Sequence, residues 1–473
     1  MPSKEPDCAE EEEGDAVASA TDDDKAAGAL IKQISEMFSC RSNSYKLHFE
    51  KETKIMSKGI VQIISLSCTR RELELEQLRL YFIANGYDVS EEDFKTDKIA
   101  DYIIVSTCGF TKAAEDFGIK TIERLEKEKK NDCQILVGGC VPKIHREAVA
   151  NYFLFDPRSY DALDEYFNMD QKYSDFPRPN TVQDIRVNNY REHGIMASNQ
   201  KKLDDEGKKT LKENIDTVEK ISEIVYNHNV GIYRIQCMLG CACKCTYCAI
   251  RFAIGPIESR PIDSILYDVQ RAIDQGKRSI ILEGDSLGGY GLDIHTNLGV
   301  LLDGIIELIH DKDISIGLPD ISPRYFKYCK SQLIRLAKLG KLFNFYIPVQ
   351  SGSQNIINRM NRGYEITQVL DDIIDIKQQC PNVCLGTSII VGFPGETEQD
   401  FLDTIHFCKS AKFDYIHCHS YSDREGTESS TFDGKIPAPV ILERSRRLKK
   451  MLIDITPMIT IAEDTSGNRT CQG

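Results

Sequence analysis

The stretch that most constrains this chain is the loop 240–248, which holds four cysteines within eight residues. Cys241, Cys245 and Cys248 have C-x3-C-x2-C spacing, and a strand-like run, 232–236, precedes them. This spacing differs from the C-x2-C-x2-C run of bacterial ferredoxins, where a further cysteine also serves as a ligand. Three thiolates on one loop would hold three irons of a cubane and leave the fourth iron open. The loop therefore predicts an iron-sulfur site, and we call these three cysteines the loop trio.

Two other interpretations of the loop trio are a zinc knot and buried free thiols. Zinc sites with four ligands usually come as two separated pairs, so the spacing disfavours zinc. Free thiols are disfavoured because so many cysteines stand close together. Cys237 and Cys243 are not cluster ligands in this interpretation, and Cys243 is expected to be structural or incidental.

A second set of cysteines follows three β-rich runs, each of which precedes a helical pattern. The runs are 60–68, 102–108 and 134–140, and they end in Cys68, Cys108 and Cys140. Repeated strand and helix predict a parallel sheet, whose sites form beyond the carboxyl ends of its strands. These three cysteines, the sheet trio, should converge at one edge as a second three-thiol site with an open iron. The alternative is that each is buried independently.

Composition indicates several domains in a reducing compartment. The chain has 473 residues and 17 cysteines, without an apolar signal segment. It also lacks a run of about 18 apolar residues, so we expect a cytoplasmic protein with no membrane segment, whose thiols serve metals. The net charge is −14, but residues 1–25 hold ten acidic residues against two lysines, so the rest carries only −6. This mild acidity weakens an RNA-binding hypothesis without excluding a local basic groove.

The loop trio resembles the cluster loop of radical S-adenosylmethionine (SAM) enzymes. In that family the open iron binds the amino and carboxylate groups of SAM. The resemblance implies that Tyr247, just before Cys248, lies beside the adenine.

The sheet trio and its surroundings resemble the amino-terminal domain of methylthiotransferases over 60–150. Cys68 is accompanied by Glu76, and the usual Asn-Thr-Cys and Thr-Gly-Cys motifs appear here as 106–108 and 138–140. Two residues depart from the usual pattern: Arg71 replaces an asparagine, and Leu75 replaces a serine. The surroundings of the second cluster are therefore expected to differ from those in common family members.

The remainder of the chain contains six strand-like runs separated by helical ones. They are 232–236, 279–283, 314–317, 343–349, 383–391 and 415–421. The fold class expected is α/β, a parallel-sheet amino-terminal domain followed by a partial (β/α)6 barrel with its reactive face at the strand ends. The expected divisions are an acidic tail and short helix (1–57), the first domain (58–155), a polar connector (156–229), the barrel (230–455) and a tail (456–473).

Four ordered barrel motifs also resemble methylthiotransferases, namely 282–291, 347–364, 387–397 and 421–427. The resemblance implies SAM contacts from Tyr247, Glu283, Gly284, Asp285, Ser286, Gln350, Ile390, Gly392 and Phe393. Helix capping is the simpler role for Asp285 or Ser286, and an isolated Gly-Phe-Pro-Gly would be an ordinary turn. Tyr346 replaces the family's histidine and Ser388 its aspartate. His417 and His419 share one strand face and receive no role.

Membership of this family implies an enzyme with two [4Fe-4S] clusters and SAM. It would convert a C-H bond to C-SCH3, with an external electron donor and a sulfur donor as partners. Alternatives are a transfer-RNA methylthiotransferase, sulfur insertion without methylation, and, from another class, an iron-sulfur carrier or redox sensor.

The sequence-based expectation for the substrate is a peptide, a protein or a small molecule. Family members continue past the barrel into a small β-barrel (TRAM) domain that grips the substrate, whereas only about twenty residues follow Lys450 here. Because RNA binding needs several phosphate contacts from lysine or arginine, folded RNA is not expected. The lysines of 201–220 alternate with acidic residues and favour a solvated helix over a nucleic-acid surface.

Overall fold

The β-rich runs that precede the sheet trio form neighbouring strands of one parallel sheet. The structure is a computed structural model that describes residues 57–90, 99–181, 232–381 and 383–455. The strand order in this first sheet is β2-β1-β3-β4-β5. Its strands are β1 (Ile60–Ser65), β2 (Asp88–Ser90), β3 (Tyr102–Thr107), β4 (Gln134–Gly139) and β5 (Phe153–Leu154).

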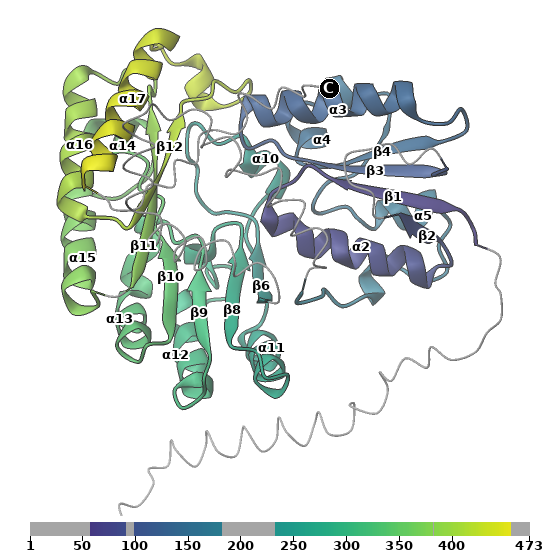
Figure 1. The fold of residues 1–473 in the computed structure, drawn as a ribbon, viewed down its shortest axis with the longest axis horizontal. Coiled ribbons are helices and arrows are strands. Elements are labelled where there is room, and N and C mark those ends of the chain that lie inside the picture. Colours follow the sequence, from purple (N-terminus) through teal and green to yellow (C-terminus); the bar gives the residue numbers. More distant parts are fainter. Residues whose placement is uncertain (1–56, 91–98, 182–231, 382, 456–473) are drawn as a thin grey trace, which may run out of the picture. The chain divides into compact units, whose positions relative to one another are not determined.

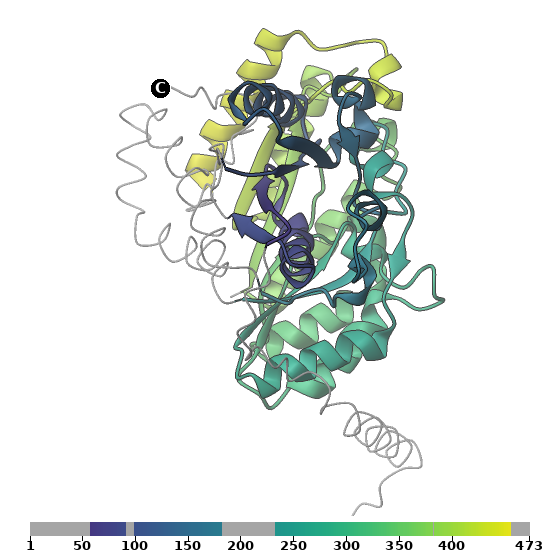
Figure 2. The same cartoon turned by 90° about the vertical axis from the view of Figure 1, so that its right-hand side faces the viewer.

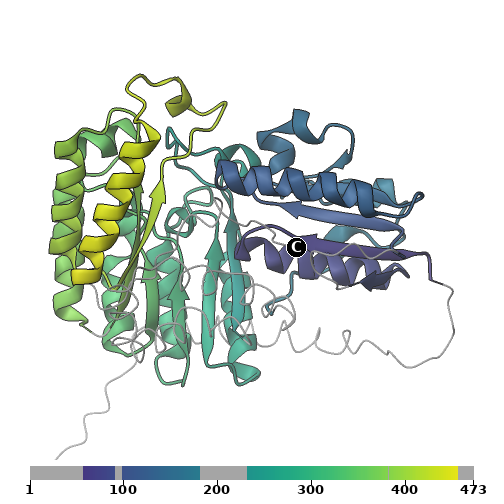
Figure 3. The same cartoon turned by 45° about the horizontal axis from the view of Figure 1, so that its top comes forward.

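Helices cover both faces of the first sheet, as Figures 2 and 3 show for α2 and α3. Side chains alternate along a strand, so β1 sends Val61 and Ile63 toward α2 and Ile64 toward α3. The helices are α2 (Glu72–Ala84), α3 (Lys112–Glu128), α4 (Val141–Ile144) and α5 (Ala162–Tyr166), with 3-10 turns η1 (Thr69–Arg71), η2 (Arg146–Val149) and η3 (Tyr173–Asp175). The result is a three-layer α/β/α arrangement.

The second sheet has the strand order β12-β11-β10-β9-β8-β6-β7, and only the β6–β7 pair is antiparallel. The six parallel strands correspond to the six predicted runs, with ends that shift by a few residues; the short edge strand β7 was not predicted. They are β6 (Tyr233–Leu239), β8 (Ser279–Gly284), β9 (Ser315–Leu318), β10 (Leu342–Tyr346), β11 (Cys384–Val391) and β12 (Tyr415–Ser420), with β7 at Glu258–Ser259. The prediction of a parallel-sheet domain followed by a partial barrel is confirmed.

Helices pack on one face of this sheet and form the main core (Figure 1). Leu385 and Ile389 of β11 point into that core with Phe401, so Ser388 and Ile390 point to the opposite, inner face. The helices are α10 (Ile250–Ile254), α11 (Ile262–Asp274), α12 (Leu298–Ile309), α13 (Lys330–Lys338), α14 (Gln354–Arg359), α15 (Ile366–Gln379), α16 (Glu398–Ala411) and α17 (Ala438–Ile455), with 3-10 turns η6 (Leu287–Gly289), η7 (Pro323–Tyr328) and η8 (Glu428–Thr431).

The beginning of the predicted connector packs against the first sheet. Tyr160, Leu163 and Tyr173 are buried in the core that α2 forms with β1, β3 and β4. The rest of the connector from residue 182, the predicted acidic tail and helix at 1–56, and the tail 456–473 lie outside the described residues. None of the helices that the structure describes is long and apolar enough to cross a membrane.

Candidate functional site: two cysteine trios joined by one carboxylate

The sheet trio lies where three neighbouring strands end. Cys108 and Cys140 directly follow β3 and β4, and Cys68 lies three residues beyond β1. The Cys140 amide donates to the carbonyl of Thr107 at 3.0 Å, and a Cβ added to Gly109 would lie 3.3 Å from the Cβ of Cys140. Burial raises the pKa of the Cys140 thiol, and the nearby thiols of Cys108 and Cys68 raise it further. The fold therefore brings the sheet trio together at one edge of the sheet.

The loop trio lies in the loop between β6 and α10, around the buried side chain of Cys243. The Cys243 amide donates to the sulfur of Cys241 at 3.3 Å; hydrogen bonding from Cys243 lowers the pKa of the Cys241 thiol. Cys245 receives a hydrogen bond from Arg362 at 3.4 Å, while burial raises the pKa of Cys248 to about 11. The backbone amides of Ile250 and Arg251 also bond Cys248, so all three sulfurs have donors that favour the thiolate, although hydrogen bonding with Cys243 and burial raise the pKa of Cys245.

The start of this loop has no room for a side chain. Gly240 has a φ of +79°, and a Cβ there would lie 1.8 Å from the carbonyl oxygen of Pro256. That carbonyl accepts from Arg158, which lies in the segment 156–181 packed on the first sheet and also donates to the carbonyl of Ile254. Glycine at this position therefore lets the backbone turn closely under this arginine.

The donor set of both trios fits a three-cysteine [4Fe-4S] cluster. Among the described residues, no group of three or more Cys, His, Asp or Glu side chains is arranged so that it could bind one metal ion. In a cubane each cysteine binds a different iron, so the ligands stand further apart than around one ion. Both trios offer thiols alone, which matches the soft ligands of iron-sulfur clusters.

A single carboxylate connects the two cysteine loops. Asp285, just after β8, accepts a hydrogen bond from the amide of Gly240 at 2.9 Å, beside Cys241. Its other oxygen accepts from Arg71, three residues after Cys68. Arg71 also donates to Glu74 at 2.6 Å, and all three charged side chains are at least 96% buried. Although burial opposes its charge, these two carboxylates raise the pKa of Arg71 well above its usual value.

The other predicted residues after β8 also have protein partners. Glu283 forms a buried ion pair with Arg234 of β6, and Ser286 hydrogen-bonds the thiol of Cys241. Gly284 packs so tightly that an added Cβ would lie 2.8 Å from the Cγ of Met238. Asp285 and Ser286, which were predicted to meet SAM, thus contact the start of the cysteine loop in this structure, whereas Glu283 contacts β6.

The ends of β10 and β11 bring together four more of the predicted residues. Gln350 has a φ of +80°; its amide donates to the carbonyl of Ser388 at 2.7 Å, and its carbonyl accepts from the amide of Ile390 at 2.8 Å. The Gln350 side-chain oxygen is buried without a hydrogen-bond partner. Ile390, Tyr247 and Phe393 share one apolar cluster, and the rings of Tyr247 and Phe393 lie 6.4 Å apart, edge to face.

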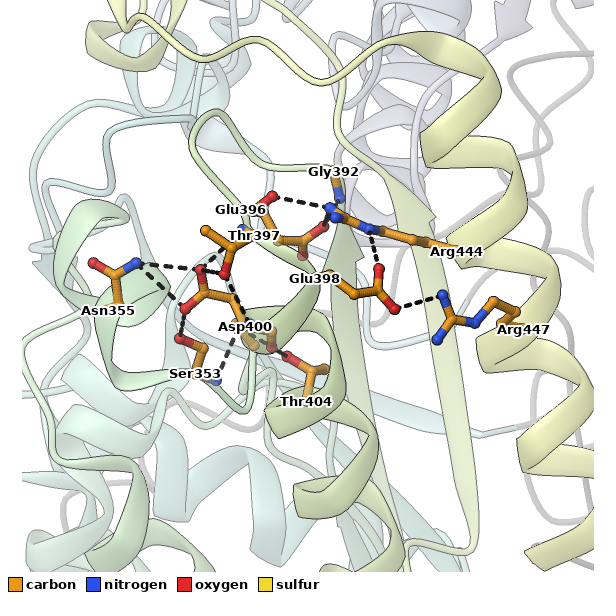
Figure 4. Close-up of polar contacts among 11 residues, drawn as sticks. Ser353, Asn355, Gly392, Glu396, Thr397, Glu398, Asp400, Thr404, Arg444 and Arg447 are labelled. Carbon is orange, nitrogen blue, oxygen red and sulfur yellow. Dashed lines mark hydrogen bonds and ion pairs between the residues drawn. The ribbon is translucent and has the colours of Figure 1, made fainter.

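A polar network supports the loop that contains Gly392, as Figure 4 shows. Glu396 accepts from the amide of Gly392 at 2.9 Å and from Arg444 of α17 at 2.8 Å. Burial raises the pKa of Glu396 to about 7, against the opposing effects of these two donors. In the same network Asp400, at the start of α16, accepts from Thr397 and from Ser353, which caps α14. The ends of β10 and β11 are thereby tied to α16 and α17.

Several residues of the site could not be assigned from the sequence. Arg71 was noted only as a departure from a family pattern, Arg362 only as part of the barrel motif 347–364, and Arg158 was not noted. A lone arginine carries no spacing signal, and these partners lie 96 to 214 residues away in the sequence. Only the fold shows that these three guanidinium groups lie next to the cysteine loops.

Two family models match this chain. The model described as "Radical SAM superfamily" covers residues 235–408, and the one described as "Uncharacterized protein family UPF0004" covers residues 60–155. The first range contains the loop trio and the second contains the sheet trio.

The relatives found include three enzymes from different organisms. A probable threonylcarbamoyladenosine tRNA methylthiotransferase of Methanocaldococcus jannaschii is 28% identical and covers 74% of each chain. The ribosomal protein uS12 methylthiotransferase RimO of Trichlorobacter lovleyi is 29% identical, covering 84% of this chain and 82% of its own. The tRNA-2-methylthio-N(6)-dimethylallyladenosine synthase of Fusobacterium nucleatum is 30% identical and covers 82% of each chain.

Among solved structures, the radical SAM methyltransferase TsrM from Kitasatospora setae, with tryptophan and a SAM analogue bound, resembles this fold. The TM-score is 0.50 at 13% sequence identity, with coverage of 76% of this chain and 72% of that one. This likeness concerns the fold alone. The 30% identical relative and the two family models show that the chain belongs to the radical SAM methylthiotransferases, enzymes that use SAM and two [4Fe-4S] clusters.

Proposed function

We propose that this enzyme converts a C-H bond of an adenosine derivative in transfer RNA to C-SCH3. The loop trio would hold the cluster that binds SAM, and the sheet trio would hold the cluster that presents sulfur. The observation that carries this division of roles is the link through Asp285, which contacts Gly240 beside the loop trio and Arg71 beside the sheet trio. A radical formed at one site and a sulfur held at the other must reach the same substrate carbon.

The residues around the loop trio suit the chemistry that the cluster and SAM supply when bound, which is removal of a hydrogen atom. Arg362 and the Cys243 amide stabilise negative charge on the sulfurs of Cys245 and Cys241. Gln350 offers its unpartnered oxygen beside Ile390, and Tyr247 and Phe393 offer apolar rings. We propose that these residues receive SAM, and that Glu283, Asp285 and Ser286 shape its pocket through the Arg234 ion pair and the cysteine loop.

The overall reaction balances with two molecules of SAM. One is cleaved with an electron from an external donor, takes the hydrogen atom and leaves as 5′-deoxyadenosine and methionine. The other gives its methyl group to sulfur and leaves as S-adenosylhomocysteine. Joining the carbon to the methylated sulfur releases one electron, and a separate sulfur donor replaces the sulfur consumed.

The choice of transfer RNA follows the relatives, two of which bear names of enzymes that act on adenosines of transfer RNA. It departs from the sequence-based expectation that folded RNA is not the substrate, which the relatives do not support. The rival substrate is a protein segment, because the third relative is named for a ribosomal protein. Sulfur insertion without methylation remains the rival reaction.

The test offers both substrate classes to the reconstituted, reduced enzyme. Total transfer RNA or a pool of peptides is incubated with SAM, then digested and searched by mass spectrometry for replacement of hydrogen by SCH3. We expect methylthiolated nucleosides in excess over enzyme. Modified peptides together with unmodified RNA would overturn the proposed substrate. Addition of sulfur alone would overturn the methylation step, and absence of 5′-deoxyadenosine would leave only a carrier or redox sensor.

A further inference from the structure

The inner face of the barrel sheet carries a polar patch that the two trios do not use. β11 and β12 run parallel, with Ser388 opposite His417 and Ile390 opposite His419. Paired residues point to the same side, and this side faces away from the helices that pack on Ile389. We call Tyr346, Ser388, His417 and His419 the inner patch.

Aromatic rings form the floor of the inner patch. Tyr346 and Tyr415 stack with their centres 5.8 Å apart, and His417 lies edge-on to each of them at 5.5 Å. The Tyr415 ring crosses Gly386, where an added Cβ would lie 2.1 Å from it. The hydroxyl groups of Tyr346 and Ser388 are hydrogen-bonded to each other. Both departures from the family pattern in the barrel thus fall on this floor.

The end of the inner patch near the carboxyl ends of β11 and β12 lies between the two trios. The ring of His419 meets Phe110 edge to face at 5.6 Å, and Phe110 is 60% exposed two residues after Cys108. On the other side, Ile390 packs with Tyr247, which is adjacent to Cys248. A substrate carbon that both clusters must reach would therefore lie next to this patch.

The chemistry of the inner patch favours a neutral, flat ligand. Burial lowers the pKa of His417 to about 3 and that of His419 to about 4, so both rings are neutral at pH 7. A neutral imidazole offers one donor and one acceptor. The Nδ1 atom of His419 and the side-chain oxygen of Gln350 are buried without a partner. An unpartnered buried polar atom is costly, and a ligand that bonds it removes that cost.

A carboxylate suits this surface poorly. Negative ligands are bound most firmly by arginine, lysine or protonated histidine. Burial keeps both histidines uncharged, and Arg424, which donates to the carbonyl of Gly109 beside Phe110, is already paired with Glu115. An aromatic base, which has donors and acceptors on its edge and stacks on aromatic rings, matches the described side chains better.

We propose that the inner patch binds the base of the nucleoside to be modified, with the base stacked against His419 and Phe110. The edge of the base would hydrogen-bond the Nδ1 atom of His419. This inference rests on the proposed action on transfer RNA. It makes His419 and Phe110 determinants of substrate binding rather than of SAM cleavage.

The test compares three variants of the reconstituted enzyme with total transfer RNA as substrate. H419F keeps an aromatic ring but loses the hydrogen bond, so the KM for RNA should rise about tenfold. H419Q retains both a donor and an acceptor and should recover part of that loss. F110A removes an exposed ring and should also raise the KM. Iron content and 5′-deoxyadenosine formed without RNA should equal those of the wild type.

The matched control is H406Q, which changes an exposed histidine of α16 on the helix-covered side of the sheet. An unchanged KM in both H419F and F110A would overturn the role of the inner patch while leaving the proposed function intact. If H419F loses iron, F110A decides the question, because its side chain is largely outside the core. Methylthiolation of peptides but not of RNA by the wild type would overturn the proposed function and this inference together.

Discussion

The two cysteine trios each bring three thiols together, one within a single loop and the other at the ends of three strands. The loop trio occupies eight consecutive residues, so its spacing is written in the sequence itself. The sheet trio joins residues from three strands, and its spacing depends on the register of β1, β3 and β4. A local site is therefore sensitive chiefly to its own residues, whereas a site built on strand ends also responds to changes elsewhere in the sheet.

The trios differ as well in what holds them to the rest of the molecule. The loop trio has donors from both sides, namely the Cys243 amide within the loop and Arg362 from beyond α14. The sheet trio relies on strand ends and, through Arg71, on a carboxylate of the barrel. The following experiments separate these dependences.

The largest effect is expected from single changes in the loop trio. C241A, C245A or C248A should each abolish 5′-deoxyadenosine formation and remove about four irons per chain, because two thiolates hold a cubane poorly. Iron analysis and chromatography of the reduced enzyme with SAM would measure both. C243A is the matched control from the same loop and should retain both properties. Substantial 5′-deoxyadenosine from any of the three would contradict the assignment of the loop trio.

Combined replacement of the sheet trio should separate the two sites. The variant with C68A, C108A and C140A should lose about four irons per chain yet still form 5′-deoxyadenosine, while methylthiolation disappears. C133A, a buried thiol of the same domain, should lose no iron. If the triple variant keeps the full iron content, these three cysteines are merely packed at the sheet edge.

Removing the cation between the trios should affect stability and coupling. R71M leaves the buried carboxylates of Glu74 and Asp285 without their guanidinium partner. The free energy of unfolding should therefore fall by about 3–5 kcal/mol. The yield of methylthiolated product per 5′-deoxyadenosine should also fall, since the two loops lose their connection. R335M removes the exposed pair with Asp303, which does not touch Asp285, and should cost about 1 kcal/mol or less. Equal effects of the two variants would argue against a special role for Arg71.

The smallest effect is expected from the ion pair of Glu396 with Arg444, which supports the loop that contains Gly392. R444M should lower stability by about 2 kcal/mol, and R447M, whose pair with Glu398 is exposed, by less. Because Glu396 already has its pKa raised to about 7 by burial, loss of Arg444 raises it further. A raised carboxyl pKa costs stability as pH increases, so the deficit of R444M should grow between about pH 6 and 8, through the value of about 7 at which Glu396 of the wild type ionises. Thermal denaturation across this range would show a constant deficit if the pair were unimportant.

The sequence predicted most of the fold because its signals are periodic and local. Alternating apolar runs gave the parallel strands, and the loop trio was evident from spacing alone. The convergence of Cys68, Cys108 and Cys140 required only the rule that parallel strands end at one edge. The packing of residues 156–181 on the first sheet was missed because that segment is polar overall, with its aromatic residues scattered. The contact of His419 with Phe110 was missed because it joins β12 of the barrel to the loop after β3 of the first domain.

The link through Asp285 also has a consequence for biosynthesis. The ribosome synthesises the segment that contains the sheet trio, Arg71 and Glu74 before it reaches Gly240. At that stage Arg71 has its partner on α2 but not the barrel carboxylate, so the first domain emerges with one charge contact unfilled. Asp285 arrives with β8, after the loop trio itself. The link through Asp285 can therefore form only after both sets of cysteines have been synthesised.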